Sequence, residues 1–264
     1  MRRSLLLLAC LVASPARAHD LFLKLEHFVQ AGATLTARLY NGSFTTSENA
    51  VVWERVREVS LVTPKGLTHP SDLGWDAATS MTRFRLSLAE PGTYVLGVST
   101  QARALRLEGK AFNAYLEEEG VLDVLEARRR DGELEKPARE RYAKHVKAVV
   151  QAGPARTPGF DQPLGYPAEI VPLGNPAALS VGGALRARCL VDGRPASGLV
   201  VLAGVQKAGE EPRPISLRSD EAGLIKIEVR SAGRYFLKFI RMARASEPGL
   251  DYESKWATLT FAVP

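Results

Sequence analysis

Cysteine is nearly absent from the 264-residue chain, which contains only Cys10 and Cys189. Cys10 lies in an amino-terminal segment that we expect to be cleaved off, so Cys189 would be the single cysteine left. An internal disulfide and a cysteine-rich metal or redox site are therefore excluded. Cys189 lies in an alternating run at residues 185–191 and is predicted to be a small core residue.

The chain also lacks the patterns of several functional classes. Beyond the amino-terminal segment it has no long apolar stretch, so we expect no membrane-spanning helix. The nucleophile elbow, the phosphate-binding glycine loop and the His-Glu-x-x-His zinc motif are missing, and we expect no enzyme. The formal net charge of +6 falls to +3 once Arg2, Arg3 and Arg17 are removed. This mild charge, without an arginine-rich patch, argues against nucleic acid as a partner.

The first eighteen residues have the three parts of a secretory signal. Met1-Arg2-Arg3 is basic, residues 5–12 are apolar but too few to cross a bilayer, and Ala16-x-Ala18 supplies the small residues before a cut. We therefore predict a signal peptide at residues 1–18, cleavage after Ala18 and a periplasmic or extracellular protein. The alternative is a lipoprotein anchored at Cys10, which would leave a shorter apolar region.

Cleavage after Ala18 would make His19 the first residue of the mature chain. An amino-terminal histidine offers its α-amine and its ring nitrogen Nδ1 to one metal ion. The amine has a reference pKa of roughly 7.7–8.0, so a metal ion can displace its proton near neutral pH. Nitrogen ligands of this kind suit Cu(II), Ni(II) or Zn(II). His19 is thus the first candidate metal ligand, and the alternative is a frayed terminus without a ligand.

Both halves of the mature chain consist of short alternating runs separated by Pro and Gly. Such runs at residues 21–25, 34–40, 56–62, 81–88 and 93–98 predict an antiparallel β-sandwich over residues 19–110. Similar runs at 199–203, 224–229, 233–239 and 257–263 predict a second sandwich over residues 166–264. The fold is therefore expected to be mainly β, with two Ig-like or prealbumin-like antiparallel sandwich domains. Residues 91–96 resemble residues 232–237, which suggests one architecture used twice.

The composition changes between the two halves. Residues 111–151 are rich in Glu, Lys, Arg, Leu and Ala. Apolar residues at helical spacing predict a first helix around Leu116 and a second that starts near Pro137 and has Tyr142 and Val146 on one face. A loop rich in Gly and Pro follows, so a helical linker region is predicted over residues 111–165.

Five segments of the chain resemble one family of exported bacterial proteins. They are Ala18–Leu23, Phe112–Gly120, Arg139–Lys144, Leu164–Leu173 and Tyr252–Phe261. The family is a domain of unknown function that was once labelled as the nickel-transport protein NikM. The resemblance extends over the mature chain from end to end. It implies an exported two-part β protein with a connection to metal handling.

Two further residues are candidate metal ligands beside His19. His69 lies in a loop, where ligands are often found, although a lone loop histidine is more often a solvated side chain. Glu169 precedes an apolar run. It is either a partly buried carboxylate at the domain junction or the salt-bridge partner of an arginine such as Arg139.

The remaining histidines are weaker candidates. His27 is separated from His19 by roughly 26 Å of extended chain, so the pair can share an ion only if the chain turns. His145 is expected on the surface of the second helix, among ordinary neighbours. The acidic run at residues 117–119 is expected to be a solvated helix face.

These observations favour a periplasmic protein that binds a divalent transition metal, Cu or Ni, for uptake or homeostasis. The metal ion would be held by His19, with His69 or Glu169 as a further ligand, and an inner-membrane transporter or envelope protein would be the partner. One alternative is a metal-free envelope scaffold or adhesion protein that binds protein or glycan. The three tryptophans at 53, 75 and 256 do not by themselves make a glycan surface, because each is expected to anchor a core. The other alternative is an oxidative copper enzyme with a histidine brace, which needs a second histidine beside His19.

Overall fold

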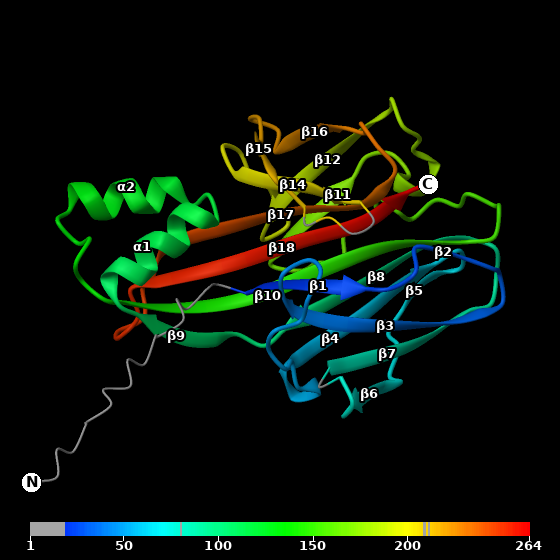
Figure 1. The fold of residues 1–264 in the computed structure, drawn as a ribbon, viewed down its shortest axis with the longest axis horizontal. Helices are drawn as coiled ribbons and strands as arrows, with labels where there is room; N and C mark the ends of the chain where they lie inside the picture. Colours follow the sequence, from blue (N-terminus) through cyan, green and yellow to red (C-terminus); the bar gives the residue numbers. More distant parts are fainter. Residues whose placement is uncertain (1–18, 80, 208–209, 211) are drawn as a thin grey trace, which may run out of the picture.

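A computed structural model describes residues 19–264, apart from residues 80, 208–209 and 211 (Figure 1). The predicted signal peptide, its cut site and Cys10 lie outside the described residues. Strand accounts for 52% of the structure and helix for 10%, which confirms the mainly β fold class. None of the helices in the described part of the chain is long and apolar enough to cross a membrane.

One large sheet of ten strands runs through the whole molecule. Its main path, in spatial order, is β15 (Ile215–Arg218), β14 (Val200–Gln206), β17 (Gly233–Arg244), β18 (Tyr252–Val263), β10 (Ala138–Ala152), β8 (Gly92–Thr100), β4 (Val56–Thr63) and β5 (Gly66–Thr68). Two more strands, β2 (Phe28–Val29) and β9 (Arg103–Leu107), pair with β10. β10 and β18 run parallel, whereas the other neighbours on the path are antiparallel. Strands from the two halves of the chain therefore meet at the β10–β18 pair.

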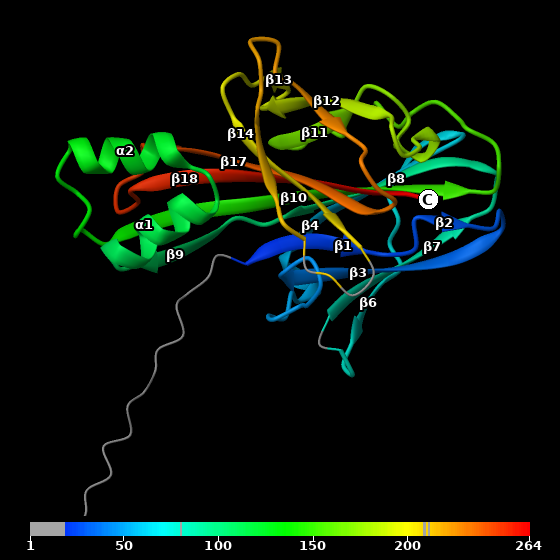
Figure 2. The same ribbon diagram turned by 45° about the horizontal axis from the view of Figure 1, so that its top comes forward.

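A smaller sheet covers each face of this large sheet. The first contains β1 (Asp20–Lys24), β3 (Ala33–Gly42), β7 (Met81–Leu88) and β6 (Leu73–Asp76), in that order. The second contains β11 (Ala168–Pro172), β12 (Ala184–Val191), β13 (Arg194–Pro195) and β16 (Leu224–Glu228). In Figures 1 and 2 the two smaller sheets lie on either side of the long strands β10, β17 and β18.

Alternation along β10 explains how one strand serves two cores. Val146, Ala148 and Val150 belong to the core beneath the first small sheet, whereas Val149 belongs to the core beneath the second. Successive side chains of a strand point to opposite faces, so both faces of β10 are buried. The prediction of two antiparallel sandwiches is confirmed, and the two share the large sheet. The domain boundaries at residues 110 and 166 stay a prediction.

Two short helices cover the end of the sheet where β10, β17 and β18 begin or end (Figure 1). They are α1 (Gly109–Glu118) and α2 (Leu122–Arg130), and their apolar faces pack on Ile240, Met242 and Trp256 of the long strands. The second predicted helix is wrong, because residues 138–152 form strand β10. Because both faces of this strand are covered, its sequence does not alternate between polar and apolar residues. Its apolar residues happen to recur at intervals that are also typical of a helix. Two single-turn 3-10 helices, η1 (Trp53–Arg55) and η2 (Pro176–Ala178), complete the elements.

The similarity between residues 91–96 and 232–237 has a structural basis. The tyrosine hydroxyl of each segment donates back to a carbonyl four residues earlier: Tyr94 to Glu90 at 2.8 Å and Tyr235 to Ser231 at 2.6 Å. Both tyrosines stand near the start of a strand in the large sheet, β8 and β17. A tyrosine that fixes a corner in this way is typical of Ig-like sandwiches.

Candidate functional site

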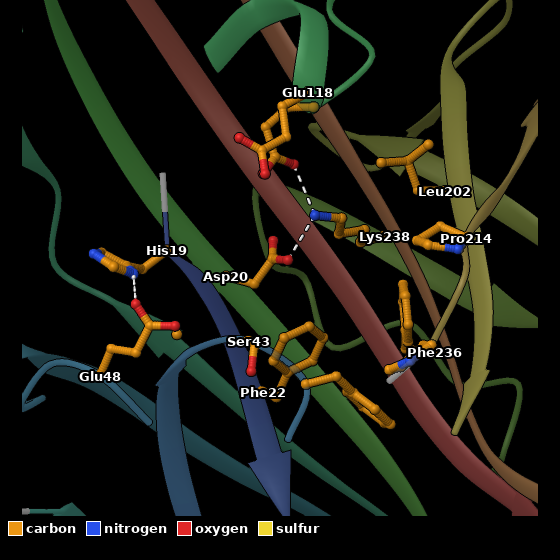
Figure 3. A pocket seen from close by; sticks show the side chains of 14 residues that line it. His19, Asp20, Phe22, Ser43, Glu48, Glu118, Leu202, Pro214, Phe236 and Lys238 are labelled. Atoms are coloured by element: carbon orange, nitrogen blue, oxygen red, sulfur yellow. Dashed lines mark hydrogen bonds and ion pairs between the residues drawn. The ribbon is translucent and has the colours of Figure 1, made fainter. Parts of the chain in front are cut away.

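A pocket of about 430 Å³ lies where the first small sheet, the helices and the large sheet meet (Figure 3). Its lining comes from β1 and the residue before it, from the end of β3 and the loop after it, from the end of α1, from β14 and β17, and from the segment before β15. The lining residues are His19, Asp20, Phe22, Gly42, Ser43, Phe44, Glu48, Glu118, Glu119, Leu202, Pro212, Pro214, Phe236 and Lys238. The predicted first residue of the mature chain is thus part of the pocket wall.

The pocket is rich in carboxylates. Lys238 is the one lysine among the described residues that line the pocket. Its Nζ donates to Asp20 Oδ2 at 2.6 Å and to Glu119 Oε2 at 2.8 Å. Burial alone would lower the pKa of Lys238, but Asp20 and Glu119 together raise it above its ordinary value, so this lysine stays charged. Burial, with repulsion from Asp20, raises the pKa of Glu119 to about 7. Even without Glu119, the carboxylates of Asp20, Glu48 and Glu118 outnumber this one lysine, so the pocket favours a cation.

His19 and Glu48 stand together at one side of the pocket. His19 Nδ1 lies 3.2 Å from Glu48 Oε2, and the side chain of His19 is 30% exposed (Figure 3). The backbone of His19 is also held, because its carbonyl oxygen accepts a hydrogen bond from Lys144 Nζ. β1 begins at the next residue, Asp20. His19 is therefore anchored at both its ring and its main chain.

Lys144, which donates to the His19 carbonyl, is itself buried. It is 6% exposed, and its Nζ stands 4.1 Å from the ring centre of Trp256, close enough for a cation–π contact. Burial lowers the pKa of Lys144 to about 8 although Asp20 and Glu119 oppose the shift. Lys144, Trp256, Asp20 and Glu119 belong to four different segments that carry the family resemblance.

Three phenylalanines form the apolar floor of the pocket. Phe22 packs edge-on against Phe44 with ring centres 4.8 Å apart, and Phe236 lies 5.0 Å from Phe44 and 5.7 Å from Phe22. Phe22 and Phe236 are almost fully buried. Edge-to-face packing of this kind fixes the rings. These ring contacts therefore fix the position of β1 relative to the loop after β3, which carries Glu48.

The donor set can be tested against a transition metal. Nδ1 of His19 and a carboxylate oxygen of Glu48 are already close together, and cleavage after Ala18 would add the α-amine. Asp20 Oδ1 is buried and has no hydrogen-bond partner among the described residues, so a further oxygen in the pocket is unsatisfied. In the described chain no group of three or more His, Cys, Asp or Glu side chains is arranged to hold a metal ion. A site here would therefore need the α-amine as a donor.

The structure does not bring the other two predicted ligands to this pocket. His69 lines a separate groove together with Trp53 and Trp75. Glu169 is 2% exposed and forms a buried ion pair with Lys147, with 3.0 Å between Lys147 Nζ and Glu169 Oε2. The buried position of Glu169 agrees with the sequence, although its partner is a lysine and not an arginine.

Glu169 is fully occupied by protein groups. Besides Lys147, its Oε2 accepts from the amide of Leu164 at 2.9 Å and its Oε1 accepts from the amide of Tyr166 at 3.0 Å. Lys147 is 2% exposed, and burial lowers its pKa although Glu169 opposes the shift. Glu169 thus fixes the loop before β11 to β10.

The two weaker histidine candidates are both buried in β-structure. His27 Nδ1 donates to the carbonyl of Val149 at 2.7 Å, and burial lowers the pKa of His27 to about 4. His145 lies on β10, and not on a helix surface, with its Nδ1 3.0 Å from Ser99 Oγ. Burial lowers its pKa to about 4 as well. Both rings are therefore neutral near pH 7.

Sequence reasoning missed three important residues of the pocket. Glu48 lies in an irregular loop, and no local pattern links it to His19. Lys238 interrupts an apolar run in β17, and a charged residue in such a run is a usable signal for a buried ion pair. Glu119 was expected on a solvated helix face but is 5% exposed, so that expectation was wrong.

Comparisons with known proteins add a family but no activity. A search of curated proteins found no match. Among solved structures, the D0–D1 domain of Intimin is similar at 10% sequence identity and a TM-score of 0.19, over 92% of this chain and 97% of that one. The family model "Domain of unknown function (DUF4198)" matches residues 16–243. This match covers most of the sequence and includes four of the five resembling segments, all but Tyr252–Phe261, so the chain belongs to the DUF4198 family.

Proposed function

We propose that this chain is an exported protein that binds one divalent transition-metal ion, Cu(II) or Ni(II), at His19 for uptake or homeostasis. The observation that carries the proposal is the placement of His19 Nδ1 3.2 Å from Glu48 Oε2 in an acidic pocket. With the α-amine freed by cleavage, two nitrogen donors and one carboxylate oxygen would be available. Mixed nitrogen and oxygen donors suit Cu(II) and Ni(II) better than Ca(II) or Mg(II).

The surroundings of His19 support binding at this position. Its backbone is held by Lys144 and by β1, so little chain entropy would be lost when an ion binds. The unpartnered oxygen of Asp20 and the surplus of carboxylates would offset the charge of the ion.

The pocket favours binding over oxidative chemistry. A histidine brace needs a second ring beside His19, and the ring of His27 is bonded to Val149 while that of His145 contacts Ser99. His69 lines the other groove. In the described part of the chain, His19 is the one histidine that lines the pocket. We therefore propose metal binding without an assigned reaction.

Thermal unfolding of the chain that begins at His19, with and without Cu(II) or Ni(II), tests this function. A ligand that binds only the native state at a hundred times its Kd stabilises it by about 2.7 kcal/mol. We expect His19→Ala to abolish the metal-dependent rise in Tm and Glu48→Gln to reduce it. His69→Ala is the matched control, because it removes an exposed histidine from a different groove. An equal rise in Tm for wild type and His19→Ala would refute the proposal.

A further inference from the structure

A second groove, of about 710 Å³, lies at one edge of the first sandwich and is independent of the His19 pocket. It is formed by η1, the start of β4, the β5–β6 connection and β6. Its lining residues are Trp53, Val56, Arg57, Glu58, Val59, His69, Pro70, Ser71, Leu73, Gly74 and Trp75. Its volume is within the range of roughly 300–1,000 Å³ that is typical of small-molecule sites.

Two of the three tryptophans of the chain line this groove and are exposed. Trp53 is 55% exposed and Trp75 is 39% exposed, whereas Trp256 is 6% exposed in the core beneath the helices. The expectation that each tryptophan anchors a core was therefore wrong for Trp53 and Trp75. Exposing two large apolar rings in one groove costs hydrophobic free energy, and grouped exposed aromatics usually mark a binding surface.

The elements that carry these tryptophans are fixed to one another. Trp75 pairs in register with Thr82, whose hydroxyl donates to the carbonyl of Val51, two residues before Trp53. The other end of η1 is held by Arg55, which is 7% exposed and stacks on Tyr142 with its guanidinium carbon 5.0 Å from the ring centre. The segments that carry the two tryptophans are therefore prearranged, which lowers the entropic cost of binding.

The groove is also lined by hydrogen-bonding side chains, and their charges balance. His69 Nδ1 is 3.2 Å from the carbonyl of Val59, which leaves Nε2 on the far side of the ring from that carbonyl. Glu58 Oε1 accepts from Ser60 Oγ at 2.9 Å and stands 3.9 Å from His69 Nδ1. Arg57, an exposed lining residue, offsets the charge of Glu58. Because the positive and negative charges of the lining cancel, the groove has no net electrostatic attraction for a strongly charged polymer.

We propose that this groove binds a neutral polysaccharide or oligosaccharide, with sugar rings stacked on Trp53 and Trp75. A sugar ring presents polarised C–H bonds on its face, which suit the negative face of an indole. Its hydroxyl groups lie at the ring edge, where Glu58, His69 and Arg57 donate or accept hydrogen bonds. The lining thus matches a ligand that is apolar on its faces, polar at its edges and uncharged.

Affinity electrophoresis in gels that contain a soluble β-1,4-glucan, an α-glucan or the neutral polymer glycol chitin tests the proposal, followed by calorimetric titration with the matching hexaose. We expect at least one neutral polymer to retard the wild-type protein. Trp53→Ala and Trp75→Ala should each weaken hexaose binding about tenfold, as loss of a central aromatic contact does at other sites. Val181→Ala, which truncates a 53% exposed side chain outside the groove, should leave binding unchanged.

Two results would overturn the assignment. Absence of retardation and of heat with every neutral glycan would exclude this ligand class, and a retained affinity in Trp53→Ala/Trp75→Ala would place binding elsewhere. Retardation by anionic alginate alone would point to a charge-driven surface and would also contradict the proposal. The metal-dependent rise in Tm should persist in the tryptophan variants, so the test does not depend on the His19 site.

Discussion

Glu169→Gln separates a structural role for Glu169 from the metal-ligand role that the sequence suggested. In the wild-type protein Glu169 balances the charge of Lys147 and accepts hydrogen bonds from Lys147, Leu164 and Tyr166. A glutamine keeps the shape but accepts through one atom only, and its amide group would face donors. Lys147 would then be a buried cation without a counter-charge.

The cost of this change follows from the burial of the pair. Both side chains are at most 2% exposed, so solvent cannot replace the lost carboxylate. Removing one partner of a buried ion pair typically costs about 3–5 kcal/mol, and we expect a loss of this size in the free energy of unfolding. The double variant Glu169→Gln/Lys147→Met should recover part of the loss, because it also removes the uncompensated charge.

The pH dependence gives this prediction a defined sign. Without Glu169 the pKa of Lys147 falls further below its unfolded value, so between the folded and the unfolded pKa the unfolded state binds more protons than the folded state. Stability then rises with pH as Lys147 loses its proton in the folded state. We expect the stability gap between wild type and Glu169→Gln to narrow between pH 7 and pH 10.

Urea denaturation at several pH values measures this gap, and metal titration of the same samples gives the second readout. The Glu169→Gln variant should be less stable but should keep the metal-dependent rise in Tm at pH values where it is folded. A variant as stable as wild type that no longer binds metal would refute the reasoning and would restore Glu169 as a ligand.

Two more substitutions test how buried polar side chains, His27 and Arg128, contribute to stability. For His27 the folded pKa of about 4 lies below the unfolded value of 6.5, so its contribution to stability is present above pH 6.5 and is lost as pH falls. Between pH 7 and pH 4 the free energy of unfolding of the wild type should therefore fall by about 3 kcal/mol more than that of His27→Gln, as measured by chemical denaturation. An equal fall in both proteins would contradict this. Arg128 is 1% exposed and donates to Asn113, to the Glu133 carbonyl and to the Lys136 carbonyl. Arg128→Met should cost about 3 kcal/mol and speed amide exchange in residues 131–137, whereas unchanged exchange would show that other contacts hold this turn.

Strands with one solvent-facing side could be predicted closely from the sequence. The run at 81–88 coincides with β7, where alternate side chains are buried. The predicted core position of Cys189 is also confirmed, since it is fully buried in the core beneath the second small sheet. In such segments every second residue is apolar and buried, so the sequence alone predicts which side chains face the core.

Strand β10 could not be recognised in the same way. It lies in the middle of the large sheet with a core on each face, so polar alternation disappears and Lys144, His145 and Lys147 are buried by partners from distant segments. Its parallel pairing with β18 joins residues more than a hundred positions apart, and no local pattern encodes that contact. The same limit applies to Glu48 beside His19, because their proximity depends on the completed fold.

The most direct test of the central claim is a Cu(II) titration of the chain that begins at His19, followed by electron paramagnetic resonance. We expect one ion per chain, nitrogen hyperfine structure from the amine and the ring, and a change in the signal in Glu48→Gln. Losing even an outer-shell partner of a metal ligand weakens binding by roughly 10–100-fold, so acetylating the α-amine should weaken it by about a hundredfold or more. Equal affinity and an identical spectrum for the free and the acetylated chain would contradict the account.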